Sequence, residues 1–160
     1  MRYYITMETP IAGRHFWVME EDGAIVAANF YFPDDQPHEW QDAIAQETPL
    51  LTEARRQLAE YFAGVRREFT LPLALHGTEF QIADWNALCT IPYGETRSYG
   101  QLAIQIGRPR AGRAVGMANH NNPISVIVPC HRVIGASGKL VGYGGGLDVK
   151  EALLRLEGVL

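Results

Sequence analysis

Apolar and polar positions in the first part of the chain follow the pattern of short strands. Runs rich in aromatic and β-branched residues cover 3–7, 15–20 and 24–32, and this composition favours pleated sheets. The segment Glu21-Asp22-Gly23, between the second and third runs, has the composition of a hairpin turn. The pattern therefore predicts a small antiparallel sheet.

After the strands, the spacing of apolar residues becomes helical. A helix is expected to begin after Thr48 and to end at Gly64. Its apolar face recurs every three or four positions, at Leu51, Ala54, Leu58, Tyr61, Phe62 and Val65. Residues 67–73 would form another strand or an extended linker, and Pro72 argues against a central strand. Because this part shows no paired carboxylates and no metal-ligand spacing, residues 1–75 are predicted to be an α/β scaffold domain.

The second half of the chain contains a succession of helix starts. Capping boxes at 78–81 and 98–101 predict helices that reach about Leu88 and Ile106. A third helix is expected over 111–119, after a turn of three or four residues, which makes a helix-turn-helix pattern.

A last helix is expected to open with Asp148-x-x-Glu151 and to turn Ala152, Leu153 and Leu156 inward. Residues 76–160 are therefore predicted to be a second, mainly α domain.

Charge is distributed unevenly between these two halves. The chain has 160 residues and a net charge of −4, but residues 97–147 hold six cations and no acid. Such a stretch indicates an anion-facing surface or a solvated basic face. The two cysteines cannot make a disulfide framework, and no apolar run approaches the roughly 20 residues of a membrane span. We expect a reducing, cytoplasmic setting and no membrane contact.

One segment has residues suited to nucleophilic chemistry. An apolar run over 125–128 leads into Pro129-Cys130-His131-Arg132. Neighbouring cations favour the thiolate form of a cysteine, which is the nucleophile, but a buried structural cysteine fits the same segment. Cys89, beside Leu88, is expected to be structural.

Two further segments favour close approach of a partner. The helix at 111–119 is rich in Ala and Gly, with Arg113 as its long side chain. It would either lie against DNA or pack tightly in the core. The glycine-rich loop at 142–146 surrounds Tyr143 and would form a pocket wall.

Together these motifs resemble the O6-alkylguanine-DNA alkyltransferases, also called methylated-DNA–protein-cysteine methyltransferases. The resemblance covers roughly residues 78–158, with kept spacing. It rests on FQ at 80–81, Trp85, IPYGET at 91–96, SYG at 98–100, RAVG at 113–116, NPI at 122–124, PCHRVI at 129–134, GY at 142–143 and GGL at 145–147. It implies a ribonuclease H-like N-terminal domain and a winged-helix-like C-terminal domain.

The resemblance also implies a single-use reaction. An alkyl group on O6 of guanine, flipped out of duplex DNA, would be transferred to Cys130. The implied catalytic residues are Cys130, His131, Glu157, Asn122 and Tyr99. The implied DNA contacts are Arg113, Ala111, Gly112, Ala114, Tyr99 and Arg110. The implied lesion pocket comprises Tyr143, Gly144, Val133 and Asn119. No cofactor is implied, and because residues 1–75 contain no cysteine we expect no zinc site like that of some relatives.

The chain departs from the family pattern at several positions. Asp84 stands where valine is usual, Gly144 where serine or alanine is common, and Leu156 where histidine is common. A roomier pocket at Gly144 would admit larger alkyl groups. We expect a monomer that binds duplex DNA containing O6-alkylguanine, with O4-alkylthymine as a further candidate lesion.

Three other functions fit parts of the pattern. A non-catalytic lesion-binding relative would lack the cysteine, which is present as Cys130. A DNA-binding regulator would show operator preference. A papain-type hydrolase would take its cysteine and histidine from distant segments.

Overall fold

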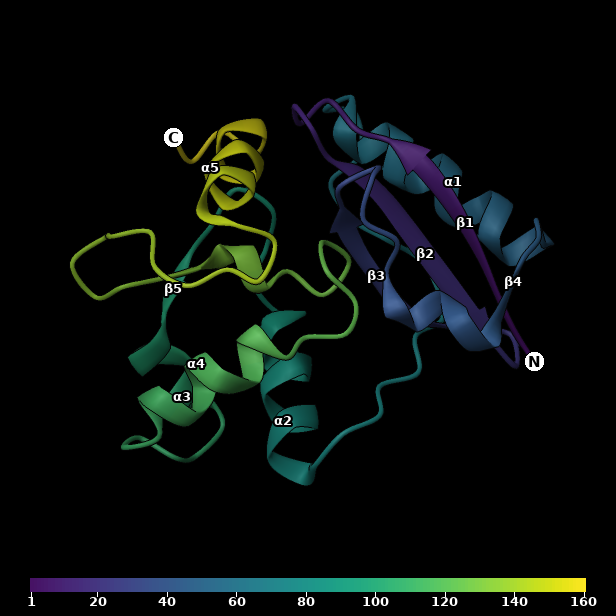
Figure 1. Cartoon of the computed structure of the whole chain (residues 1–160). Coiled ribbons are helices and arrows are strands. Elements are labelled where there is room, and N and C mark those ends of the chain that lie inside the picture. Colours follow the sequence, from purple (N-terminus) through teal and green to yellow (C-terminus); the bar gives the residue numbers. More distant parts are fainter. The chain divides into compact units, whose positions relative to one another are not determined.

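The computed structural model describes all residues, 1–160. The chain divides into two compact units, Met1–Leu75 and His76–Leu160 (Figure 1). None of the five helices combines the length and apolar character needed to cross a bilayer.

The first unit is built on a four-stranded sheet with the order β3-β2-β1-β4. Its strands are β1 (Arg2–Glu8), β2 (His15–Glu21), β3 (Ala24–Tyr31) and β4 (Ala43–Ala45). The antiparallel pairing of the first three strands is as predicted. The short strand β4 was not predicted; it pairs parallel to β1, so the sheet is mixed. Asp22 and Gly23 both have positive φ, which is the geometry of the tight turns that join such hairpins.

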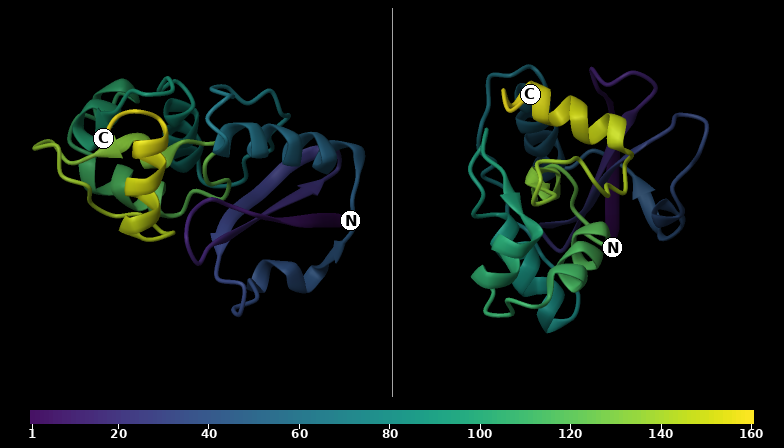
Figure 2. Two further views of the ribbon diagram at one scale, coloured as in Figure 1. Left: turned by 90° about the horizontal axis from the view of Figure 1, so that it is seen from above. Right: turned by 90° about the vertical axis from the view of Figure 1, so that its left-hand side faces the viewer.

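Both faces of the sheet are covered. The helix α1 (Pro49–Phe62) lies along one face (Figures 1 and 2), where the rings of Phe16 and Phe62 meet edge to face. On β2 the neighbouring Trp17 is also buried, and its ring meets that of Trp40 from the 3₁₀ helix η1 (His38–Asp42). Large aromatic side chains therefore supply much of this core.

The predicted ends of α1 are confirmed. Thr48 caps its first turn by accepting from the amide of Leu51 at 3.1 Å, and Gly64 takes a positive φ just past its end. The segment after it forms no strand; a single bridge between Leu73 and Ile25 joins it to β3.

The second unit is mainly helical. Its helices are α2 (Glu79–Leu88), α3 (Tyr99–Gln105), α4 (Gly112–His120) and α5 (Leu147–Leu156), together with the 3₁₀ helix η2 (Cys130–Arg132). Two short strands, β5 (Arg97–Ser98) and β6 (Val133–Ile134), pair in parallel. Both predicted capping boxes are present, at the starts of α2 and α3.

Two boundaries differ from the prediction. The linker between α3 and α4 spans residues 106–111 and is longer than expected, because α3 ends at Gln105 and α4 begins at Gly112. The last helix begins at Leu147 without a side-chain cap, so Asp148 lies inside its first turn rather than opening it. Its buried face is formed by Val149, Lys150, Leu153 and Leu154, whereas Ala152 and Leu156 are half-buried.

Candidate functional site

The loop before Cys130 has an unusual backbone. Val126 is buried and has a φ of 72°, a region that β-branched residues rarely occupy. The amide of Ile127 donates to the carbonyl of Ser125 at 2.8 Å, and the amide of Cys130 donates to that of Val128 at 2.9 Å. These two bonds close successive three-residue turns, so the chain reaches Cys130 along a tightly bent path.

Asn122 fixes this bent loop. Its Nδ2 donates to Val128 O at 2.8 Å, and its Oδ1 accepts from the amide of Ile124 at 3.0 Å. Asn122 is itself buried. One side chain therefore ties the two ends of the loop together just before Cys130.

Behind Cys130 lies a buried charged network centred on Glu157. His131 Nε2 lies 2.7 Å from Glu157 Oε2, and Arg132 donates through Nε and Nη2 to the two carboxylate oxygens at 2.8 and 3.0 Å. Arg132 Nη1 also donates to Ile91 O at 2.7 Å, and the amide of Gly94 donates to Glu157 Oε1 at 3.1 Å. Two segments that are distant from Glu157 in the sequence thus meet on its carboxylate.

Burial favours the neutral forms of two groups at this site, the Cys130 thiol and the His131 imidazole. Burial raises the pKa of the Cys130 thiol to about 11, against the opposing effects of a hydrogen bond from Asn122 and the charge of Lys150. Burial also lowers the pKa of His131, although Glu157 opposes that shift. The thiol and the imidazole of these consecutive residues are therefore both neutral at pH 7.

Lys150 is a second buried cation near the thiol. Its Nζ donates to Val133 O at 2.5 Å and to Val141 O at 3.0 Å, and Gly142 O lies 3.5 Å away. Burial lowers the pKa of this amine to about 8. It joins the segment after Cys130 to the start of the glycine-rich loop.

Two tyrosines lie within electrostatic range of Cys130. Tyr99 begins α3, and its hydroxyl donates to Val141 O at 2.9 Å. The hydroxyl of Tyr143 is buried, and burial raises the pKa of that phenol well above its usual value. Ionisation of Cys130 would raise the pKa of both phenols, which indicates their proximity to the sulfur.

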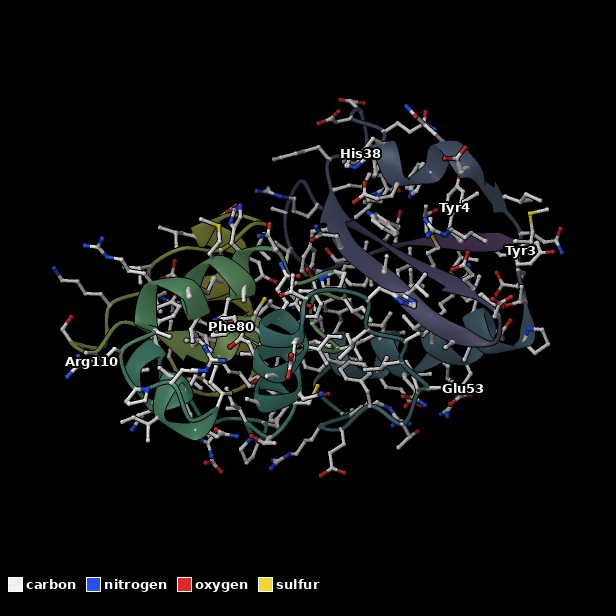
Figure 3. All side chains as sticks on the ribbon, turned by 90° about the horizontal axis from the view of Figure 1, so that it is seen from below. Tyr3, Tyr4, His38, Glu53, Phe80 and Arg110 are labelled. Atoms are coloured by element: carbon white, nitrogen blue, oxygen red, sulfur yellow. The ribbon has the colours of Figure 1, made fainter.

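The helix α4 presents small residues to solvent. Arg113 and Ala114 are exposed, and Gly112 is half-buried. A Cβ added at Gly112 would meet no atom within 4 Å, so core packing does not account for that glycine. Arg110, in the linker before α4, extends away from the ribbon (Figure 3).

Several predicted residues lie elsewhere than expected. Arg132 is buried against Glu157, so it does not belong to the basic surface that the charge pattern suggested. Cys89 is exposed at the end of α2, not in the core. The Asn119 amide contacts Asp84 on α2, so its place in the lesion pocket stays a prediction.

The remaining pocket residues have defined neighbours. A Cβ at Gly144 would lie 3.7 Å from His120 O, an ordinary contact. Val133 is fully buried and pairs with Arg97 across the two-stranded sheet. No group of three or more His, Cys, Asp or Glu residues is arranged to hold a metal ion.

Sequence reasoning missed the structural roles of Arg132 and Lys150. Arg132 was treated as a local cation beside the thiol. Lys150 looked like any polar residue of a surface helix. A signal was present for Lys150, because it stands at a position flanked by Val149 and Leu153, on the apolar face of the last helix.

Comparison with known proteins gives two family models that match nearly the whole chain. The model described as "6-O-methylguanine DNA methyltransferase, ribonuclease-like domain" matches residues 2–75. The model described as "6-O-methylguanine DNA methyltransferase, DNA binding domain" matches residues 79–159.

Individual relatives agree with these matches. A methylated-DNA–protein-cysteine methyltransferase of Methanosarcina acetivorans is 52% identical over 156 residues, 98% of each chain. A protein of the same name from Mycobacterium tuberculosis is 67% identical over 101 residues, 63% of this chain and 61% of its own length.

Solved structures are similar over the same extent. The crystal structure of the M. tuberculosis O6-methylguanine methyltransferase has a TM-score of 0.87 at 48% identity, covering 98% of this chain and 93% of that one. The structure of M. tuberculosis OGT in complex with DNA has a TM-score of 0.85 at 48% identity, covering 97% and 92%.

Proposed function

The chain belongs to the 6-O-methylguanine DNA methyltransferase family, and we propose that it repairs DNA by moving an alkyl group from O6 of guanine to Cys130 in a single irreversible turnover. The observation that carries this proposal is the buried His131–Glu157 pair, whose Nε2 and Oε2 lie 2.7 Å apart, with His131 directly after the buried Cys130 in the sequence. These residues supply a candidate nucleophile, a candidate base and a group that would orient the base.

Binding of DNA is the first step of the proposed reaction. The similar M. tuberculosis protein has been solved in complex with DNA, and α4 here offers an exposed face of small residues with Arg113. A base must leave the duplex before its O6 can be reached, which costs about a few kcal/mol. Arg113 would fill the gap in the stack, while Ala111, Gly112 and Ala114 would allow close approach of the backbone, and Arg110 would contact phosphate.

Activation of the thiol is the second step. Because Cys130 and His131 are both neutral at rest, the thiol is protected from chance reactions. When the flipped base enters, His131 takes the thiol proton through a water molecule. Glu157 stabilises the resulting imidazolium, and the Lys150 cation favours the thiolate.

Transfer completes the reaction. The thiolate attacks the alkyl carbon, the new bond joins sulfur to carbon, and the bond from carbon to O6 breaks with its electrons going to guanine. Tyr99 would supply a proton or hydrogen bond to the guanine ring; its hydroxyl now donates to Val141 O and would exchange that acceptor for the base. The product is a thioether, so the protein acts once.

The lesion pocket would be formed by Tyr143, Gly144, Val133 and Asn119. The absence of a side chain at Gly144 favours alkyl groups larger than methyl, and O4-alkylthymine is a further candidate substrate. We propose a cytoplasmic monomer, since both cysteines are free thiols and one chain supplies every residue of the site. On this proposal residues 1–75 are the scaffold domain and residues 76–160 the DNA-binding and transfer domain.

Mass spectrometry tests the proposal directly. Protein is mixed with an equimolar duplex carrying one O6-methylguanine and then digested with trypsin. The expected result is one added methyl group on the peptide 114–132, which contains Cys130 but not Cys89, with no second turnover. Tight binding without modification would identify a damage sensor instead. The Cys130→Ala variant is the control and should bind the duplex without being modified.

A further inference from the structure

Asp84 is a carboxyl group in the core of the second unit without a cationic partner. It lies on α2 and is fully buried, at 0% exposure. No Lys, Arg or His lies within salt-bridge distance of it. Of the elements packed against α2, α4 presents the neutral amide of Asn119, and η2 presents the Cys130 thiol, whose ionisation is coupled to that of Asp84. An unpaired carboxylate at such a site would be costly.

The only side-chain partner of this carboxyl is a neutral amide. With its nitrogen toward Asp84, the Asn119 side chain donates to Asp84 Oδ2 at 2.5 Å and to Val115 O at 3.3 Å. An amide carries no charge, so nothing offsets a negative charge on the fully buried Asp84. Burial without a cation favours the protonated carboxyl, whose carbonyl oxygen accepts from Asn119 Nδ2.

Resting on the function proposed above, we propose that Asp84 is a positioning residue that works in its protonated form, holding the end of α4 through Asn119 and keeping negative charge away from Cys130. Two observations connect it to the reacting sulfur. Asn119 O accepts from the amide of Asn122 at 3.1 Å, and Asn122 fixes the loop before Cys130. Trp85, the next residue of α2, donates through Nε1 to Ala118 O at 2.9 Å, so the same two helices are joined twice.

Ionisation of Asp84 would act on the sulfur directly. A negative charge at Asp84 raises the pKa of the Cys130 thiol, which disfavours the thiolate needed for transfer. Burial raises the pKa of Asp84 to about 7. The carboxyl therefore loses its proton near neutral pH. As the pH rises, the rate of alkyl transfer should increase less than the ionisation of the Cys130 thiol alone would predict.

The isosteric variant Asp84→Asn tests this, because it keeps an oxygen that accepts from the Asn119 amide and cannot ionise. The rate of alkyl transfer from free O6-benzylguanine is measured between pH 6 and pH 8.5. The ratio of variant to wild-type rates is expected to rise from about 1 at the lowest pH to roughly 3 at the highest, because only the wild type gains a negative charge that raises the pKa of the thiol. The control Glu79→Gln removes an exposed carboxylate from the first turn of the same helix and should give a constant ratio. A constant ratio for Asp84→Asn as well would overturn the proposal.

A second measurement does not depend on transfer. Difference infrared spectra between wild type and Asp84→Asn at pH 6 should show the carbonyl stretch of a protonated carboxyl group, and this band should vanish with a midpoint near pH 7. A carboxylate signal at pH 6 would refute the protonated form. If the band is present but no variant transfers an alkyl group, the proposed function fails while the state of Asp84 stands.

Discussion

The two units of this chain handle polar groups in their cores in opposite ways. In the first unit the buried polar residues are Glu20 and Gln57, and the core consists mainly of aromatic and aliphatic side chains. The second unit buries a set of polar and charged residues: Asp84, Asn119, Asn122, Ser125, His131, Arg132, Lys150 and Glu157. Its interior therefore combines structural and chemical roles, whereas the interior of the first unit is structural.

The difference shows where each unit is vulnerable. An apolar core loses stability gradually when atoms are removed, because the loss follows the buried area and the cavity left behind. A buried ionic network fails abruptly, because removal of one partner leaves another charge uncompensated.

The largest effect is expected from Glu157→Gln. The buried Arg132 guanidinium would lose its counter-charge, which costs about 3–5 kcal/mol of unfolding free energy. Denaturant unfolding measures this loss, and mass spectrometry should show strongly reduced alkylation of Cys130. The matched control is Glu60→Gln in the first unit, which removes the ion pairs with the exposed Arg56 and the half-buried Arg66 and should change stability far less. Equal losses of unfolding free energy in the two variants would contradict the proposed difference between the two units.

A core deletion in the first unit should separate stability from chemistry. Leu58 is fully buried on α1, and Leu58→Ala is expected to cost about 3 kcal/mol. At a temperature where the variant remains folded, its rate of transfer from free O6-benzylguanine should equal that of the wild type. A reduced rate in the fully folded variant would mean that the first unit takes part in the chemistry.

The variant Arg113→Ala tests the proposed role of this exposed side chain in base flipping and leaves the core of the second unit unchanged. Arg113 is exposed, so little stability should be lost. Transfer from duplex DNA is expected to fall by about tenfold, equivalent to roughly 1.4 kcal/mol of the cost of flipping the base. Transfer from free O6-benzylguanine should be unchanged, and Arg155→Ala, an exposed cation on α5, serves as the control. Equal reductions for both substrates would count against insertion into the stack.

The smallest effect concerns alkaline pH. Burial raises the pKa of the Cys130 thiol from 9.0 to about 11, so the folded state retains a proton that the unfolded state releases above pH 9. Stability should therefore fall as the pH rises from 9 towards 11, by at most about 1.4 kcal/mol per pH unit. Thermal unfolding at pH 8.5 and pH 10 measures this loss. Between these two pH values the wild type should lose more stability than the Cys130→Ala variant, by this amount. Parallel pH curves would show that the thiol is not shielded as described.

Much of the framework could be predicted from local patterns. The two capping boxes, the Thr48 cap and the Asp22-Gly23 turn were all predicted, because each depends on residues within a few positions of one another. The motif around Cys130 likewise indicates the family, because its residues are consecutive in the sequence.

The parts that could not be predicted depend on distant partners. Arg132 is buried because Ile91 O and the Glu157 carboxylate accept hydrogen bonds from its guanidinium group. These two acceptors lie 41 and 25 residues away in the sequence. Lys150 is buried because the carbonyls of Val133 and Val141 converge on its amine. Strand β4 forms because three residues reach the free edge of β1. No local spacing encodes these meetings.

The position of Glu157 in the chain has a consequence for synthesis. The ribosome makes Cys130 before it makes Lys150 and Glu157, so a nascent chain exposes its nucleophile before the carboxylate that supports His131 exists. On the proposed mechanism, the cysteine lacks its base assembly until α5 and Glu157 fold into place, and until then it would react as an ordinary thiol. A protein that acts only once would thus become reactive only after a segment that follows its cysteine has been translated and folded.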